Sequence, residues 1–205
     1  MTDQSWDSVA ENWENQEGVK LFSEQTSRLL LDQFSEDNFS QATILDLGCG
    51  TGFLSRLLSQ HHHCKAVVSI DPSKEMLNVL QSHLVDKDNN IRSLQGVLDD
   101  EMVLKLLKEN YGPFDAVVAN SVCSFVPDYE DLLARIVRVL VPGGIFLQCD
   151  WEQQSQPLTN NNADGFHHEM IRRTFVKAGL DVIDIKSAFK IMDMQVIAGV
   201  GRKAG

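Results

Sequence analysis

The 205-residue chain is 43% hydrophobic and 23% charged, which is typical of a globular protein, and its length is enough for one domain with a buried core. Its formal net charge of −11 produces a negative field that repels nucleic acid and anionic membrane surfaces, so we expect neither as a partner. The sequence has no uncharged apolar run of the length that a membrane span requires.

The first 40 residues have a helical pattern. Trp6, Ala10 and Trp13 fall at steps of four and three residues and therefore share one helix face. A second apolar stripe runs over residues 21–34. We expect a single domain, 1–205, in which residues 1–40 form a helical lid over the carboxyl edge of a sheet built from residues 41–205.

From residue 41 onward, short runs rich in Val and Ile alternate with helical patterns, which predicts βαβ units and a largely parallel sheet. The expected strands are 43–47, 65–70, 91–95, 114–119, 144–149, 180–186 and 195–201. The expected helices are 53–60, 73–84, 129–140 and 166–178, and the sequence PGG at 142–144 stops the third and turns the chain into the next strand. No helix separates the last two strands, so we expect an antiparallel hairpin there.

The stretch LDLGCGTGF, residues 45–53, places three glycines directly after the first strand. Glycine is needed where a ligand approaches the backbone or where φ is positive, and open α/β sheets bind ligands at the carboxyl ends of their strands. The spacing GxGxG differs from the dinucleotide pattern GxGxxG, because Phe53 stands where the third glycine belongs. No lysine follows the glycines, which excludes a Walker loop.

An acidic residue, one spacer and GxGxG resemble the first motif of the class I S-adenosylmethionine-dependent methyltransferases, and Asp46, Gly48, Gly50 and Gly52 match it. Later motifs of that family follow in the same order, in segments 70–77, 114–122 and 140–147. The resemblance covers roughly residues 40–150. It implies an α/β fold, a Rossmann-like, doubly wound, seven-stranded and mostly parallel sheet with a reversed last strand and helices on both faces, and S-adenosyl-L-methionine as the cofactor.

The resemblance also implies a set of cofactor contacts. The main chain of residues 48–52, which includes Cys49, contacts the methionine part of the cofactor, and Asp46 holds its amino group. Asp71 accepts hydrogen bonds from the two ribose hydroxyls, and Pro72 covers one face of the adenine. Carboxylates and carbonyl oxygens near the sulfonium stabilise its positive charge.

Two segments depart from the family pattern. The third-strand motif usually offers an Asp to the adenine amino group, but Val97 stands at the aligned position. Asp99, or the main chain of Val97 and Leu98, is expected to serve instead. After the fourth strand, Asn120 is expected to contact the cofactor, and residues 123–128 lack the His pair that members with small-molecule substrates often carry.

Methyl transfer by direct displacement depends mainly on alignment, and the need for a general base varies with the acceptor. Acceptor-side candidates cluster in residues 149–154 and 164–173. His167 and His168 are the candidate bases, since imidazole suits proton transfer at neutral pH. Adjacent helix residues point in different directions, however, and the alternative is that one histidine caps the helix while the other faces water.

The segment SWDSVAENWE resembles the N-terminus of the ubiquinone and menaquinone biosynthesis methyltransferases, in which a helix covers the cofactor. Trp6 and Trp13 are therefore candidates for an aromatic lid on the substrate side that excludes water from the sulfonium. The alternative is that both are simply buried helix positions.

The remaining cysteines and histidines indicate no metal site. Cys49, Cys64, Cys123 and Cys149 form no CxxC pair, and the consecutive residues 61–63 cannot converge on one ion. Cys49 has no evident base beside it and is expected to be a small filler rather than a nucleophile. The acidic N-terminus differs from a basic signal peptide, so we expect a cytoplasmic protein.

We therefore expect methyl transfer from S-adenosylmethionine to a small organic acceptor, with a protein acceptor as a further possibility. A non-catalytic domain that binds this cofactor and regulates a partner is the alternative. The altered third and fourth motifs favour that alternative, whereas the intact first motif with Asp71 opposes it. A nicotinamide-dependent oxidoreductase is a less favoured alternative, because Phe53 breaks the dinucleotide pattern.

Overall fold

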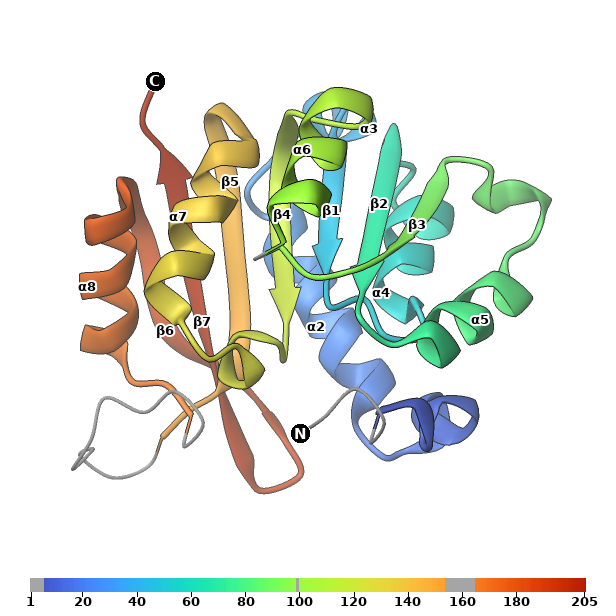
Figure 1. Cartoon of the computed structure of the whole chain (residues 1–205). Helices are drawn as coiled ribbons and strands as arrows, with labels where there is room; N and C mark the ends of the chain where they lie inside the picture. The colour runs from blue at the N-terminus through green and yellow to red at the C-terminus, as the bar shows by residue number, and fades with distance from the viewer. Residues whose placement is uncertain (1–5, 99, 154–164) are drawn as a thin grey trace.

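The computed structural model describes residues 6–98, 100–153 and 165–205. Seven strands form one sheet in the order β3-β2-β1-β4-β5-β7-β6 (Figure 1). The strands are β1 (Thr43–Leu47), β2 (Ala66–Asp71), β3 (Ile91–Gln95), β4 (Phe114–Asn120), β5 (Leu140–Trp151), β6 (Leu180–Ile191) and β7 (Met194–Lys203). Strands β1 to β5 are parallel, and β7 runs antiparallel to both of its neighbours. This arrangement confirms the predicted doubly wound sheet with a reversed last strand.

Helices cover both faces of the sheet. Helices α6, α7 and α8 pack on one face, and α2, α3 and α4 pack on the other (Figure 1). The helical segments are η1 (Ala10–Asn15), α2 (Val19–Leu31), α3 (Glu36–Ser40), α4 (Phe53–Arg56), η2 (Leu57–His61), α5 (Lys74–His83), η3 (Asp86–Asp88), α6 (Glu101–Asn110), η4 (Cys123–Phe125), α7 (Tyr129–Val139) and α8 (His168–Ala178).

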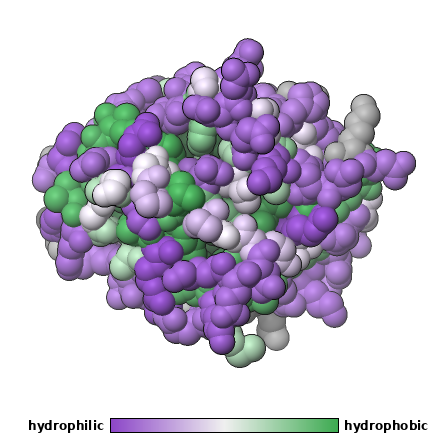
Figure 2. All heavy atoms as spheres, turned by 90° about the horizontal axis from the view of Figure 1, so that it is seen from above, coloured by the Kyte–Doolittle hydropathy of each residue, from purple (hydrophilic) through white to green (hydrophobic). Residues whose placement is uncertain are grey.

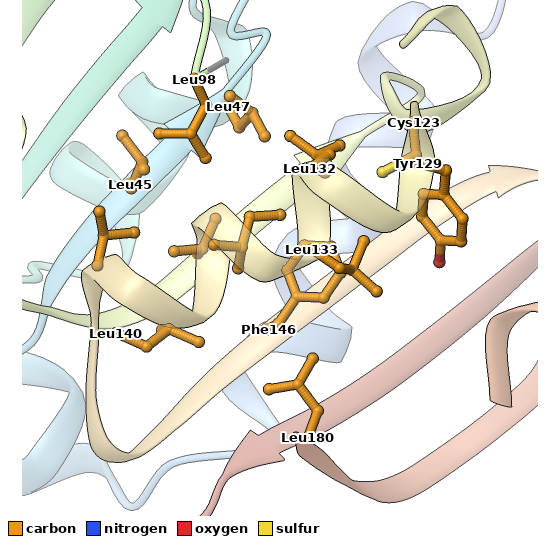
Figure 3. Packing of buried hydrophobic residues seen from close by; sticks show 14 of the residues in the cluster. Leu45, Leu47, Leu98, Cys123, Tyr129, Leu132, Leu133, Leu140, Phe146 and Leu180 are labelled. Carbon is orange, nitrogen blue, oxygen red and sulfur yellow. The ribbon is translucent and has the colours of Figure 1, made fainter. Parts of the chain in front are cut away.

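The apolar stripe of α7 shows how sequence pattern becomes packing. Leu132 and Leu133 are 3% and 0% exposed, and Figure 3 shows Leu133 lying against Phe146 of β5. Burying one such leucine side chain stabilises the fold by about 1.5–3 kcal/mol. On the same face, Leu98 packs beside Leu47 at the end of β1 (Figure 3). This layer holds the strand ends in fixed positions.

Residues 142–144 are counted within β5, which therefore begins four residues before the predicted strand 144–149, although the chain still turns at PGG, where a Cβ on Gly144 would lie 2.9 Å from Val141 O. Helix α7 ends at Val139, and β5 begins at Leu140. The pairing of β4 with β5 shifts in register between Phe114 and Ala116, opposite this segment. Gly143 has a φ of +79°, so the chain forms a bulge that straightens into the parallel strand.

Several helices differ from the predicted ones. The Trp13 segment is a short 3-10 helix, and the expected helix over 53–60 changes to a π-helical turn at Leu57. The last helix begins at His168 rather than at residue 166. Helices α3 and α6 were not predicted, although Asp100 marks the start of α6 by accepting a hydrogen bond from Met102 N at 2.7 Å.

All parallel strands end at the lower edge of the sheet in Figure 1, where η1, the start of α2 and the β6–β7 hairpin gather. The opposite edge is seen in Figure 2, where hydrophilic residues predominate and apolar ones form smaller groups between them. Among the residues that the structure describes, no helix is both long and apolar enough to cross a membrane. The lower edge is therefore where the ligand site is sought.

Candidate active site

A cavity of about 400 Å³ opens at the carboxyl ends of the strands. The glycine loop after β1 and Asp71 at the end of β2 form one side of it. Asn120 of β4 lies in the middle, and Trp151 of β5 and Met194 of β7 form the other side. Cavities of this size hold small ligands and cofactors.

Backbone hydrogen bonds shape the glycine loop. Gly48 N and Cys49 N both donate to Ile70 O, at 2.8 and 3.0 Å, which folds the loop over the end of β2. Gly50 has a φ of +53°, and a Cβ built there would meet only Trp13 Nε1 at 3.7 Å and Met76 Sδ at 3.9 Å as its nearest neighbours. Both of those residues line the cavity, so the bare backbone at Gly50 is open to a ligand.

The other two glycines serve packing. A Cβ at Gly48 would lie 2.4 Å from Val122 Cγ2, and one at Gly52 would lie 2.2 Å from Leu80 Cδ1 of α5. Gly48 lines the cavity, whereas Gly52 does not. The missing side chain at Gly52 therefore lets the loop pack on α5, and a contact between its main chain and a cofactor stays a prediction.

Asp71 is positioned by two backbone amides. Gly50 N donates to its Oδ2 at 2.8 Å, and Ser73 N donates to its Oδ1 at 2.9 Å. The residue is 8% exposed and faces the cavity. A carboxylate has about four acceptor positions, so two amide bonds do not exhaust its capacity to bind a pair of hydroxyls. Pro72, which follows it, also lines the cavity.

Asp46 lies deeper, at 1% exposure, with Ser55 Oγ donating to its Oδ2 at 2.5 Å. Because that bond uses the only hydroxyl proton of Ser55, Ser69 Oγ donates to Ser55 Oγ across their 2.7 Å contact. Burial raises the pKa of Asp46 to about 7; the nearby Asp71 carboxylate also raises it, and the Ser55 bonds lower it. A cation bound beside Asp46 would favour its ionised form.

Cys49 lines the cavity without an activating base. Burial raises the pKa of its thiol well above the usual value, and the Asp46 and Asp71 carboxylates raise it further. The thiol therefore stays protonated at neutral pH, which supports its interpretation as a filler.

His167 and His168 do not line the cavity. His167 caps α8, since its Nδ1 accepts from Met170 N at 3.4 Å. His168 Nδ1 lies 3.7 Å from Glu152 Oε1, and its side chain is 47% exposed. One histidine thus caps the helix and the other is largely in solvent, as the alternative interpretation of the sequence holds.

The third-strand candidates do not reach the cavity with their side chains. Val97 is 41% exposed, and Leu98 is 2% exposed within the α6 and α7 side of the core; neither lines the cavity. Asp99 lies outside the described residues.

The N-terminal segment covers the glycine loop and carries both tryptophans to the cavity. The ring centroid of Trp6 lies 5.5 Å from that of Trp13 and 5.3 Å from that of Phe125, in edge-to-face contacts. The contact with Phe125 of η4 bridges the N-terminus to the segment after β4. These three rings therefore run from the glycine loop to the segment after β4.

Two polar contacts fasten this segment. Ser73 Oγ donates to Asp7 Oδ1 at 2.5 Å. Arg56 Nη2 lies 2.8 Å from Glu14 Oε1, and the same guanidinium donates to Thr51 O at 2.7 Å. Burial raises the pKa of Glu14, but the hydrogen bonds from Arg56 and Thr51 outweigh it and leave this pKa below its usual value. Glu14 is therefore charged at neutral pH and paired with Arg56.

Asn120 joins the end of β4 to α2. Thr26 Oγ1 donates to Asn120 Oδ1 at 2.6 Å, and Asn120 Nδ2 donates to Ser23 Oγ at 3.3 Å. Asn120 faces the cavity, so it positions α2 as one wall.

Some cavity residues were not predicted from sequence. Glu17 lies just before α2, Phe22 and Ser23 lie in its first turns, and Met192 and Met194 come from the β6–β7 hairpin. The apolar stripe over 21–34 includes Phe22, but nothing local to the hairpin indicates that it closes a ligand site.

The chain is similar in sequence to trans-aconitate 2-methyltransferase of Azoarcus sp. (strain BH72), with 31% identity over 65% of this chain and 48% of that protein. It is also 31% identical to the ubiquinone biosynthesis O-methyltransferase of Caulobacter vibrioides, over 56% of this chain and 45% of that one. The chain thus spans just under half the length of these relatives.

A solved structure of 1,6-didemethyltoxoflavin-N1-methyltransferase from Burkholderia thailandensis, with 1,6-didemethyltoxoflavin and S-adenosylhomocysteine bound, has the same fold. Its TM-score is 0.74, with 17% identity over 99% of this chain and 87% of that one. A family described as a methyltransferase domain matches residues 45–148. The chain therefore belongs to this family, which confirms the resemblance to the class I S-adenosylmethionine-dependent methyltransferases, enzymes whose cofactor is S-adenosylmethionine.

Proposed function

We propose that this chain transfers the methyl group of S-adenosylmethionine to a small organic acceptor by direct displacement, and that it does so in the cytoplasm. One observation supports the proposal most directly. The carboxyl side chains of Glu17, Asp46 and Asp71 line the described part of the cavity around a loop of bare backbone, and no Lys, Arg or His stands among the described lining residues. Such a site complements a cation and disfavours the phosphates of a dinucleotide.

The residues present fit the cofactor of the family. Asp71 offers two oriented carboxylate oxygens for a ribose diol, and Asp46 offers a buried negative charge for an ammonium or sulfonium group. The open position over Gly50 admits the methionine part, and Pro72 and Met76 offer apolar surface for an adenine. Bound there, S-adenosylmethionine supplies a methyl group on a positively charged sulfur. Val97, Leu98 and Asp99 remain proposed partners of the adenine amino group.

The protein's part in the reaction is alignment and exclusion of water. The Gly50 and Ser73 amides hold the Asp71 carboxylate in place before any ligand binds. The rings of Trp6, Trp13 and Phe125 cover the cavity and restrict the approach of water. No imidazole stands among the described lining residues, so the proposal assigns no general base and relies on the acidity of the acceptor itself.

A small-molecule acceptor is supported by the names of the relatives, which refer to ubiquinone biosynthesis and to trans-aconitate. The size of the cavity supports it as well, since about 400 Å³ must hold both cofactor and acceptor. A protein acceptor would have to insert a side chain past Met192 and Met194 at the mouth of the cavity.

The test combines binding with turnover. Calorimetry with S-adenosylhomocysteine is expected to show binding to the wild-type chain and about 10- to 100-fold weaker binding to Asp71→Asn, because charge-assisted hydrogen bonds contribute about 1.5–3 kcal/mol. Asp181→Asn makes the same chemical change at an exposed position at the start of β6 and is expected to leave the affinity unchanged. Equal affinities for Asp71→Asn and wild type would contradict the assignment of Asp71.

Transfer of a labelled methyl group to a panel of phenols, thiols, amines and enols then separates an enzyme from a regulator. We expect the wild-type chain to give labelled product with at least one acceptor class. We expect Asp71→Asn to give no labelled product when the cofactor concentration is far below the dissociation constant of that variant for the cofactor. Tight binding of the cofactor without transfer to any acceptor would favour the alternative, a regulatory domain that binds S-adenosylmethionine.

A further inference from the structure

We infer that the acceptor is an uncharged, largely apolar molecule with a planar ring, and that acceptors carrying carboxylate or phosphate groups are rejected. The inference rests on the proposed function, since it names the class of molecule that fills the part of the cavity left by the cofactor.

Strand order separates the two parts of the cavity. The glycine loop and Asp71 follow β1 and β2, whereas β5, β7 and β6 lie on the other side of β4. The acceptor side is therefore the part over β5 and β7, closed by the start of α2. Its described walls are formed by Val19, Phe22, Trp151, Ile191, Met192 and Met194.

These walls are aromatic and thioether surfaces. Phe22 is 5% exposed, and its ring meets Trp151 and Phe189 edge to face at centroid distances of 5.4 and 5.3 Å. The aromatic wall is thus fixed by packing on both sides. Met192 and Met194 are 64% and 49% exposed at the mouth, and their flexible side chains can adapt to a flat apolar ligand. Such surfaces recognise shape and apolar area rather than charge.

Asn120 and Ser23, two of the polar side chains that line the cavity, bond to each other and to α2. Asn120 accepts from Thr26 and donates to Ser23, and Ser23 Oγ donates onward to Val19 O at 3.3 Å. Both ends of the Asn120 amide are thus engaged by α2. A charged ligand group that turned to Asn120 or Ser23 would have to compete with these bonds.

The charges that line the cavity are of one sign. Glu17 is exposed and lies directly before the N-cap of α2, and Asp46 and Asp71 lie on the cofactor side. No Lys, Arg or His lines the described part of the cavity. The residues outside the described ranges, 1–5, 99 and 154–164, include none of these side chains either.

Two cations lie near the cofactor side, and neither lines the cavity. Lys20 Nζ and the Arg56 guanidinium lie 5.8 and 5.7 Å from the ring centre of Phe53, directly after the glycine loop. Arg56 is also bonded to Glu14 and Thr51. The methionine part of the cofactor carries an ammonium beside its own carboxylate, but an anionic acceptor brings no counter-ion. The charge of an anionic acceptor would be desolvated next to an acidic residue, with no protein cation among the described lining residues to pair with it.

The experiment measures acceptor binding to the chain saturated with S-adenosylhomocysteine, using three matched pairs that differ by one carboxylate. One such pair is 2-naphthol and 6-hydroxy-2-naphthoate. The uncharged member of at least one pair is expected to bind, and in each pair that binds it is expected to bind at least about tenfold more tightly than the carboxylate.

A charge reversal at the mouth of the cavity tests whether Glu17 contributes to the rejection of carboxylates. Glu17→Arg is expected to reduce that ratio at least about fivefold, because it places a cation where the carboxylate enters. Glu109→Arg makes the same charge change on the far part of α6, at a side chain that is 61% exposed, and is expected to leave the ratio unchanged. An equal effect of the two variants would show that the net charge of the protein, rather than the position of Glu17, sets the ratio. That result would overturn the role assigned to Glu17.

The outcomes separate the two proposals. No binding of S-adenosylhomocysteine would end the proposed function itself. Binding of S-adenosylhomocysteine together with equal or tighter binding of the carboxylates would overturn the acceptor class and leave methyl transfer standing. Failure of every uncharged member to bind, up to its solubility limit, would overturn the acceptor class as well.

Discussion

The two sides of the cavity are built from different materials. The cofactor side consists of main chain and two buried carboxylates, held by hydrogen bonds such as Gly50 N to Asp71 Oδ2 at 2.8 Å. The acceptor side consists of apolar side chains from three segments, the start of α2, the end of β5 and the β6–β7 hairpin. The first depends on the path of the backbone, whereas the second depends on which side chains that path presents.

This difference explains how the fold separates cofactor binding from acceptor recognition. The backbone path of the glycine loop follows from positive φ angles and from its bonds to Ile70 O, which leave little freedom in sequence. Residues such as Met192 and Met194 lie at a hairpin tip and can change without disturbing the sheet. Selectivity for the acceptor can therefore vary while the cofactor side stays the same.

The largest expected effect comes from filling the open position of the loop. In Gly50→Ala, the added methyl would lie beside Trp13 Nε1 in space that a ligand needs. We expect the affinity for S-adenosylhomocysteine to fall at least about tenfold by calorimetry, because a well-packed site does not absorb an extra methyl without strain of about 1–3 kcal/mol.

Gly179→Ala is the matched control for backbone strain. Gly179 ends α8 with a φ of +87°, and a Cβ there meets nothing within 4 Å. Both variants place alanine in the left-handed region, at a cost of about 1–2 kcal/mol to stability, but only Gly50→Ala should lose affinity. Equal affinities in the two variants would show that the loop is not the binding surface.

The cofactor side could be predicted from the sequence because its constraints are local. The strand 43–47, the glycine loop and Asp71 were predicted at positions that the structure brings to one cavity. The role of Gly52 could not be predicted locally, since it depends on Leu80 of α5 approaching the loop. The signal of helix α6, with Asp100 before Leu104 and Leu107 at a three-residue step, was present in the sequence.

Most of the acceptor side could not be predicted from the sequence, because tertiary folding brings its residues together from distant segments. Trp151 is the last residue of β5, and the segment 149–154 was a predicted acceptor-side cluster. Met194, in contrast, reaches the cavity only because β7 is inserted antiparallel between β5 and β6. His167 was a candidate base, and its position directly before α8 makes it a cap instead.

The next effect in size is a dependence of cofactor affinity on pH. The pKa of Asp46 is raised to about 7 in the ligand-free protein, mainly by burial. A cationic ligand favours the ionised carboxylate, so affinity should rise with pH through about 7 and level off above it. Between pH 5.5 and 7.5, below the titration of an α-amino group, we expect an increase of up to about tenfold in calorimetric affinity.

Asp46→Asn is expected to bind more weakly and to lose this dependence, because the amide accepts the bond from Ser55 but does not titrate. Titration of Asp46 affects the stability of the ligand-free fold with the opposite sign. A carboxyl whose folded pKa is raised favours the folded state less as pH rises from its unfolded pKa, about 4, to about 7. An affinity that falls with pH in the wild-type chain would exclude Asp46 as the partner of the cation.

The smallest expected effect tests whether the N-terminal segment belongs to the cofactor side alone. Glu14→Gln removes the charge that pairs with Arg56 at 2.8 Å, where the two side chains are 14% and 12% exposed. Pairs of this kind contribute up to about 1 kcal/mol, so the affinity for S-adenosylhomocysteine should fall about two- to fivefold. Glu130→Gln breaks the surface pair with Lys177 between α7 and α8 and should change nothing. If the segment only covers the glycine loop, Glu14→Gln should leave the ratio of uncharged to carboxylate acceptors unchanged, whereas a shift in that ratio would mean that the lid also shapes the acceptor side.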